Sequence, residues 1–249
     1  MQFIEIQNDV NIVKVILHRG KVNALNNQVV EEFHYTLIDL SKDPDVKAII
    51  ISGSGKFFSF GFDIPEFLSY SKQKFTDYLI KFTNLYTYIF TYPKPVIAAI
   101  NGHAVAGGCM LASACDKRIM VSGKAKISLN EINFGSSVFA GSTEMLRFCV
   151  GDKNATEVLY SGSMYSPEEA QELGLIDIIT NENDLMTEAS KLAIELSEKP
   201  APAFASIKSL LRKSVAEEME LKEKESIQRF VDIWYSESTW KNLKDLKIY

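Results

Sequence analysis

Two glycine-containing turns carry the residues of this chain that are best placed to do chemistry. One is NGHAVAGGCMLASACD (101–116), in which Gly107 and Gly108 stand between an apolar strand pattern and an apolar helix pattern. The first N–H groups of a helix lack acceptors within it, and the helix dipole adds about half a positive charge there. Because glycine lets a ligand approach the backbone closely, this turn could hold an anion or a developing oxyanion. Close packing of a strand against a helix would use the same residues, so the turn alone leaves both interpretations open.

The second turn, FFSFGFDIPEF (57–67), also follows an apolar strand pattern and also carries a glycine where a helix begins. Two such loops after neighbouring strands can direct two backbone N–H groups at one point, which is the arrangement of an oxyanion hole. The chain has neither a GxGxxG nor a GxxxxGKS/T pattern, so these turns do not predict nucleotide binding.

Other reactive side chains have structural interpretations beside the chemical ones. His103 could act as an acid or base, or pack with a hydrogen bond to the backbone; Cys109 could be a nucleophile or a small buried residue. Glu131, in SLNEINFG (128–135), could be a base, a loop carboxylate or a helix cap. The three histidines and three cysteines never fall at metal-ligand spacing, so no metal site is predicted.

Alternating strand and helix patterns must position these turns. The first are a hairpin over 3–18 and a helix over 27–41, with Asn26 or Asn27 as its N-cap. A buried strand over 46–52, a long aromatic helix over 66–91 and a buried strand over 96–100 follow. The last are the strand-like segments KRIMVS (117–122) and KAKISL (124–129). This alternation predicts an α/β fold with mostly parallel sheets.

From about residue 184 only helical apolar patterns remain. They predict helices around 185–196, 204–211 and 216–235, with Trp240, Leu243 and Leu246 near the end of the chain. Such stripes usually form core, and a partner subunit is the second interpretation.

Composition and charge indicate an ordinary globular protein and argue against some classes of binding protein. Of the 249 residues, 46% are hydrophobic and 24% charged, and the formal net charge of −5 argues against a general binder of nucleic acid or membrane surfaces. Three cysteines without a CxxC spacing fit a reducing compartment. No apolar run approaches the ~20 residues of a membrane span, and the first residues enter a strand pattern rather than a signal peptide. We expect a cytoplasmic protein.

Three motifs in a fixed order resemble the crotonase superfamily of enoyl-CoA hydratases and isomerases. They are SFGFD (59–63), NGHAVAGGCMLASACDKRI (101–119) and SLNEINFG (128–135), and the likeness extends from KVNALN (21–26) through SGSMYSPEEAQELGLID (161–177). The resemblance implies a crotonase-like spiral of repeated ββα units over residues 1–195 and an α-helical trimerisation region over 196–249. It also implies a homotrimer or a hexamer built as a dimer of trimers. The implied substrate is an acyl-CoA thioester, with CoA as part of the substrate and no separate cofactor.

The resemblance also assigns site residues. Backbone N–H groups of Phe60 and Gly107 would hold the thioester oxygen, and Lys21 would contact the CoA phosphates. The other positions implied to bind substrate are Ala24, Gly61, Phe62, Asp63, Ile64 and Asn130. Phe60 stands where the family usually has a small residue, and together with Phe62 it would reshape the acyl and adenine channels.

The acid–base residues distinguish reactions within this superfamily. Its hydratases use two glutamates, and the corresponding positions here are Met110 and Glu131. One carboxylate suffices to move a proton from C2 to C4 of a 3-enoyl thioester through a dienolate. The triplet Leu129-Asn130-Glu131 and the segment FVDIWYSESTWKNLKDL (230–246) are similar to Δ3,Δ2-enoyl-CoA isomerases, which also carry an apolar residue at the position of Met110.

An isomerase with Glu131 as its base is therefore predicted. The apolar neighbours Leu129, Ile132 and Phe134 would raise the pKa of this glutamate by desolvation. The alternatives are another crotonase-type enolate reaction (hydration, decarboxylation or a carrier-protein-linked polyketide step) and an inactive acyl-CoA-binding subunit.

Overall fold

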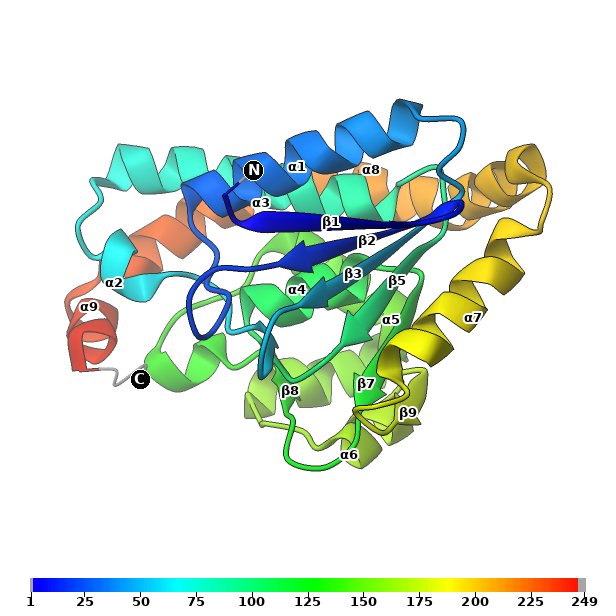
Figure 1. Ribbon diagram of the computed structural model, residues 1–249. Coiled ribbons are helices and arrows are strands. Elements are labelled where there is room, and N and C mark those ends of the chain that lie inside the picture. The colour runs from blue at the N-terminus through cyan, green and yellow to red at the C-terminus, as the bar shows by residue number, and fades with distance from the viewer. Residues whose placement is uncertain (1, 246–249) are drawn as a thin grey trace.

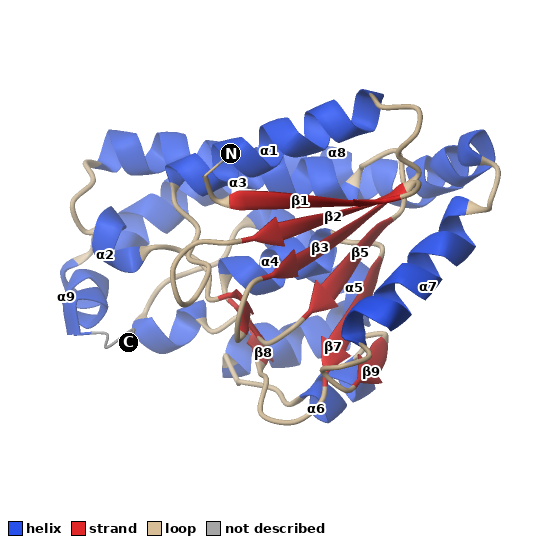
Figure 2. Cartoon of the chain, viewed as in Figure 1, coloured by secondary structure: helices blue, strands red, loops and turns tan. Residues whose placement is uncertain are grey.

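The computed structural model describes residues 2–245, so the predicted helical position Leu246 lies outside the described residues. Its main sheet has six strands, which fan out across the middle of the molecule (Figure 2). In spatial order they are β1 (Ile4–Asp9), β2 (Ile12–Leu17), β3 (Ala48–Gly53), β5 (Val96–Ile100), β7 (Lys117–Val121) and β9 (Ile178–Thr180). β1 and β2 form the predicted antiparallel hairpin, and every other neighbouring pair is parallel.

A second, three-stranded parallel sheet contains β4 (Phe57–Ser59), β6 (His103–Val105) and β8 (Ile127–Ser128). β4 and β6 lie in segments that the sequence patterns treated as a loop and a turn. Each follows a strand of the main sheet and precedes a helix, so the chain repeats a β–β–α unit. This confirms the predicted α/β spiral of ββα units.

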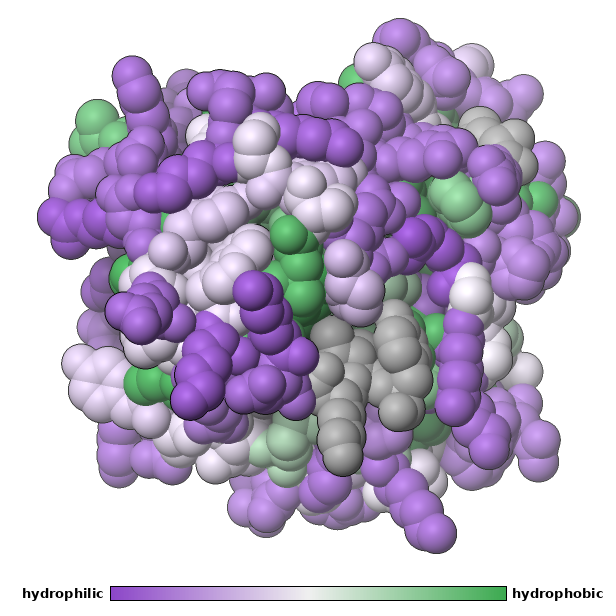
Figure 3. Space-filling view, turned by 90° about the vertical axis from the view of Figure 1, so that its left-hand side faces the viewer, coloured by the Kyte–Doolittle hydropathy of each residue, from purple (hydrophilic) through white to green (hydrophobic). Residues whose placement is uncertain are grey.

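Helices cover the main sheet on both sides (Figure 1). α1 (Asn27–Lys42) packs against α3 (Lys72–Phe90), α3 packs against α8 (Ala201–Trp234), and α7 (Leu185–Ser197) crosses β2, β3, β5 and β7. The remaining helices are α2 (Ile64–Phe67), α4 (Gly107–Ala114), the 3₁₀ helix η1 (Glu131–Phe134), α5 (Ala140–Ser161), α6 (Pro167–Leu173) and α9 (Glu237–Asp245). α2 and α9 lie at one end of the molecule, on a face whose surface is mostly hydrophilic (Figure 3).

Side-chain caps account for the starts of α1, α2, α3 and α6. Asn26 caps α1, because its side chain accepts a hydrogen bond from the Val29 N–H at 3.1 Å. The single helix predicted over 66–91 is wrong: α2 ends at Phe67, and Ser71 caps the separate helix α3. Residues 68–71 separate these two helices.

The helical state predicted around 204–211 and 216–235 is confirmed, but the break between two helices is wrong, because α8 is one continuous helix of 34 residues. Residues 204–234 contain no glycine or proline, the residues that most strongly disfavour a helix interior, so nothing in this segment ends the helix. The predicted boundary after residue 195 falls inside α7. The division into a spiral core and a C-terminal region stays a prediction.

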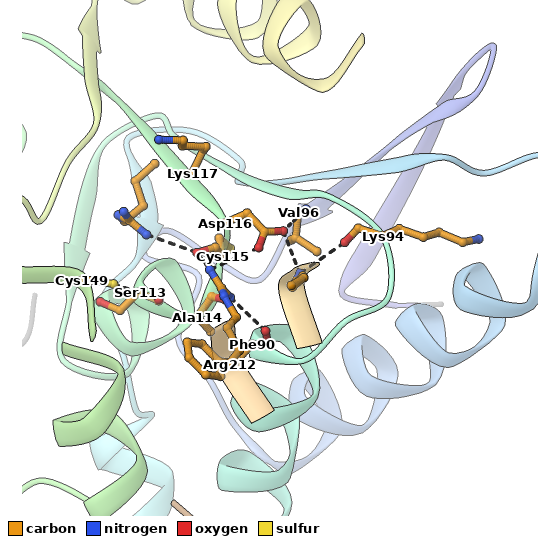
Figure 4. A network of polar contacts seen from close by, with 12 residues as sticks. Phe90, Lys94, Val96, Ser113, Ala114, Cys115, Asp116, Lys117, Cys149 and Arg212 are labelled. Atoms are coloured by element: carbon orange, nitrogen blue, oxygen red, sulfur yellow. Dashed lines mark hydrogen bonds and ion pairs between the residues drawn. The ribbon is translucent and has the colours of Figure 1, made fainter. Parts of the chain in front are cut away.

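A buried ionic cluster holds the first half of α8 against the sheet. The Lys208 Nζ lies 2.7 Å from Asp116 Oδ2, and an Arg212 nitrogen lies 3.2 Å from Asp116 Oδ1. Arg212 also donates to the carbonyl oxygens of Phe90 and Ala114, at the ends of α3 and α4 (Figure 4). These contacts place α8 across the ends of two core helices.

Candidate functional site

The two glycine turns meet in the folded chain. Gly61 has a φ of +85°, and a Cβ added to it would lie 2.9 Å from the Val105 carbonyl oxygen and 3.0 Å from the Gly107 nitrogen. A Cβ at Gly108 would overlap the Ser59 carbonyl oxygen. Both glycines are therefore required by the close approach of the two backbones.

The backbone N–H groups of the first turn differ in what they bind. The Phe60 N–H donates to the Val22 carbonyl oxygen at 3.0 Å, and the Gly61 N–H donates to Ser59 Oγ at 3.1 Å. The prediction that Phe60 supplies a free oxyanion donor is therefore wrong, because pairing with residues 22–25 already uses its N–H. Among the hydrogen bonds of residues 2–245, none engages the N–H of Phe62 or that of Gly107.

A cavity of about 170 Å³ lies beside this junction. Six aromatic side chains dominate its walls, and the residues lining it are Phe60, Phe62, Ile64, Val105, Ala106, Asn130, Glu131, Phe134, Phe139, Phe230 and Trp234. Apolar walls with a few polar groups are typical of a small-molecule site.

Glu131 is the one carboxylic acid among those lining residues. It begins η1 and is only 4% exposed, and its Oε2 has no hydrogen-bond partner within the described chain. Burial raises the pKa of Glu131 to about 8. A carboxyl group with this pKa is suited to general acid–base chemistry near neutral pH.

Position 110, where hydratases of the crotonase superfamily carry their other glutamate, is apolar in this chain. Met110 lies on α4, one turn after Gly107, and is buried in the core. Asn130, next to Glu131, lines the cavity, and its Oδ1 has no hydrogen-bond partner among the described residues. The cavity wall thus includes one carboxyl group and Phe62, whose N–H is unpaired within residues 2–245. Gly107, whose N–H is likewise unpaired in that range, is not a lining residue itself but directly follows the lining residue Ala106.

The remaining predicted site residues divide into lining and supporting positions. Phe60, Phe62 and Ile64 line the cavity, whereas Lys21 and Ala24 do not. Lys21 is exposed, and Ala24 is buried.

Asp63 does not line the cavity either. Its Oδ1 accepts a hydrogen bond from the Glu66 N–H at the start of α2, and its Oδ2 pairs with Arg19 at 2.6 Å. Asp63 therefore supports the turn rather than the cavity wall.

His103 and Cys109 do not contribute to the cavity wall. His103 lies on β6, and burial lowers its pKa. Cys109 is fully buried, and burial raises the pKa of its thiol to about 12, which disfavours the thiolate that a nucleophile needs.

Four aromatic wall residues are absent from the predicted site residues, and one of them is Phe134, the last residue of η1. Phe139 immediately precedes α5, and Phe230 and Trp234 lie near the end of α8. Phe139 and Phe230 stack with ring centroids 4.4 Å apart, and Phe230 stacks on Trp234. The helical spacing of apolar residues over 216–235 predicted that Phe230 and Trp234 are buried, but it did not predict that they line this cavity.

Within residues 2–245, no group of three or more His, Cys, Asp or Glu side chains is placed to hold a metal ion. None of the helices in that range combines the length and apolar character that crossing a bilayer requires.

Comparisons with known proteins cover almost the whole chain. A sequence model described as enoyl-CoA hydratase/isomerase matches residues 7–244. A probable enoyl-CoA hydratase of Bacillus subtilis (strain 168) is 35% identical over 240 residues, which are 95% of this chain and 92% of that protein. The mitochondrial enoyl-CoA hydratase of Pongo abelii is 36% identical over 217 residues, 86% of this chain and 72% of that protein.

Solved structures share the fold. Human mitochondrial Δ3-Δ2-enoyl-CoA isomerase superposes with a TM-score of 0.94 at 24% identity, covering 98% of this chain and 96% of that one. An enoyl-CoA hydratase of Bacillus halodurans gives a TM-score of 0.90 at 25% identity, covering 98% and 100%. The ββα repeats, the meeting of the two glycine turns and these matches lead to one conclusion: the chain is an enzyme of the enoyl-CoA hydratase/isomerase family, with the crotonase fold.

Proposed function

We propose that this enzyme is an isomerase that moves a double bond from C3 to C2 of an enoyl-CoA thioester. The observation that supports this is the single carboxyl group, Glu131, among the residues lining the cavity. A proton shift needs one group that both removes and returns a proton, and one carboxylate can do both.

The proposed reaction begins with the thioester oxygen accepting hydrogen bonds from the N–H groups of Phe62 and Gly107. Gly107 is the first residue of α4, so the helix dipole adds to its effect on developing negative charge. Ionised Glu131 takes a proton from C2, and the electron pair delocalises into a dienolate whose charge rests on the thioester oxygen. Protonated Glu131 then returns the proton to C4, leaving the conjugated 2-enoyl thioester. CoA takes part as the substrate's carrier group, and we propose no cofactor.

Hydration is the second candidate, because both curated relatives described above are named as hydratases. Adding water across a double bond is best served by a base for the water and an acid for the α-carbon. The buried Met110 thioether can be neither, which favours isomerisation.

We also propose that the enzyme works in the cytoplasm as a homotrimer or as a dimer of trimers. The trimer follows from the family resemblance. A reducing compartment is supported by three cysteines that all remain free in the described chain.

A paired assay tests the reaction. One arm offers 3-hexenoyl-CoA and follows the conjugated product, and the other offers 2-hexenoyl-CoA and follows its hydration. We expect fast isomerisation and slow hydration. Glu131→Gln should lower isomerisation by about 10²–10⁴-fold, since it removes the proton-transferring group.

Glu144→Gln is the matched control. Glu144 lies on α5, pairs with Arg147 and Lys222, and does not line the cavity. Hydration faster than isomerisation, or isomerisation that is indifferent to Glu131→Gln, would refute the proposal.

A further inference from the structure

We propose that Arg19 is a positioning residue for the oxyanion site: it holds the Gly61–Phe62 turn so that the Phe62 N–H faces the thioester oxygen. This inference rests on thioester binding in the cavity, as in the proposed function, but not on which reaction follows.

Arg19 joins two segments that come from different parts of the chain. Its NH2 lies 2.6 Å from Asp63 Oδ2 and 3.3 Å from Glu66 Oε2, directly after the turn. Its NH1 donates to the Ala24 carbonyl oxygen at 3.1 Å, in the segment that pairs with the turn. One guanidinium therefore ties both segments together.

Backbone hydrogen bonds also join residues 22–25 to the turn over residues 60–63. The Phe60 N–H donates to the Val22 carbonyl oxygen at 3.0 Å, and the Leu25 N–H donates to the Gly61 carbonyl oxygen at 2.8 Å. The Asp63 N–H donates to the Leu25 carbonyl oxygen at 3.1 Å. Phe62 lies between Phe60 and Asp63, whose N–H groups both serve this pairing, and no hydrogen bond among residues 2–245 uses the Phe62 N–H.

The charges around Arg19 explain why an arginine is needed. The side chains of Arg19 and Asp63 are only 20% and 13% exposed, so their interaction is poorly screened. Without the guanidinium, the carboxylates of Asp63 and Glu66 would repel each other. A lysine could neutralise them, but its single ammonium cannot match the planar fork that spans two carboxylates and a carbonyl.

The same network continues to the residue that follows α8, directly after the wall residue Trp234. Glu66 also accepts hydrogen bonds from Asn26 Nδ2 at 2.8 Å and from the Tyr70 hydroxyl at 2.6 Å. The Tyr235 hydroxyl, next to the wall residue Trp234, donates to the Tyr70 carbonyl oxygen at 2.7 Å. Loss of Arg19 should therefore disturb the geometry of the site more than the affinity for CoA.

The test uses hexanoyl-CoA labelled with ¹³C at the thioester carbonyl, which can be neither isomerised nor hydrated. Its C=O stretching frequency in the bound state reports the strength of the hydrogen bonds to the thioester oxygen. We expect the wild-type enzyme to lower this frequency and Arg19→Gln to lose most of that shift. Affinity should change less than about threefold, while kcat for 3-hexenoyl-CoA falls by about 10–10²-fold.

Matched variants separate positioning from general damage. Arg147→Gln removes an arginine that pairs with Glu144 and Asp152 on the surface, and should keep the full shift. Arg19→Lys should recover part of the shift. Glu66→Gln keeps the Arg19–Asp63 pair and should retain most of the wild-type shift. If Arg19→Gln fails to fold, Arg19→Lys takes its place, and a full wild-type shift in Arg19→Lys would then overturn the proposal.

Two results would overturn the inference. One is a full wild-type shift in folded Arg19→Gln, and the other is a wild-type enzyme that binds hexanoyl-CoA without any shift. A wild-type shift that Arg19→Gln loses, in an enzyme that does not isomerise 3-hexenoyl-CoA, would support the inference while refuting the proposed reaction.

Discussion

The carboxyl group of Glu131 decides how activity depends on pH. Its pKa is raised from 4.5 to about 8 by burial, and only the ionised form can take a proton from C2. We therefore expect kcat/KM for isomerisation to rise with pH and to level off above about pH 8. A pH–rate profile measures this. A profile that is already flat at about pH 6 would mean that Glu131 titrates normally or is not the base.

The same pKa shift predicts a cost in stability. Glu131 binds its proton more tightly in the folded state, so its contribution to the unfolding free energy falls as pH rises from 4.5 to about 8. Glu131→Gln should raise that free energy by on the order of 4 kcal/mol at pH 8, and by little at pH 4. Denaturant unfolding at both pH values measures the difference. The control, Glu144→Gln, should not show this pH-dependent gain.

At the scale of elements, the cluster of Asp116, Lys208 and Arg212 anchors α8. Both cationic side chains are at most 7% exposed, and the Asp116 carboxylate also accepts the Val96 N–H at 2.8 Å. Asp116→Asn should lower the unfolding free energy by about 3–5 kcal/mol, because it leaves two buried cations without a counter-charge.

Equilibrium unfolding in urea tests this anchor. Lys213→Met is the control. Within residues 2–245 the one ion pair of Lys213 is an exposed pair with Glu217, so its loss should change stability by less than about 0.5 kcal/mol. An equally small effect of Asp116→Asn would show that α8 is held by its apolar contacts alone.

At the scale of the molecule, α8 turns apolar side chains outward. Ile207, Leu210 and Leu211 are 59%, 81% and 59% exposed, while Lys208 and Arg212 of the same turns point inward. Exposed apolar patches of this kind often mark subunit contacts. We expect a second copy of the chain to cover these residues, so Leu210→Glu should shift the assembly toward single chains of 28.0 kDa.

Sedimentation velocity distinguishes the assembled and single-chain states. Val10→Glu places the same charge on a residue that is 92% exposed in the β1–β2 turn, outside α8 and its apolar residues, and should leave the assembly intact. Single chains in the wild-type enzyme would contradict the proposed trimer.

The sequence by itself determined the features that depend on neighbours along the chain. The strand over 96–100, the cap at Asn26 and the helix that begins at the glycine turn all follow from patterns within a few residues. The resemblance to the crotonase superfamily, which points to positions 110 and 131, indicated a single carboxylate once Met110 and Glu131 were known. These features are local because capping, glycine freedom and strand patterning act over one or two turns of chain.

Only the tertiary structure decided which groups share the cavity. Whether Phe60 or Phe62 keeps a free N–H depends on pairing with residues 22–25, and no local pattern encodes that register. Phe230 and Trp234 reach the wall because α8 continues without a break, and its direction is set by buried cations whose partners lie about a hundred residues earlier. Contacts between distant segments arise from packing and charge pairing in the folded chain, so they could be read only from the structure.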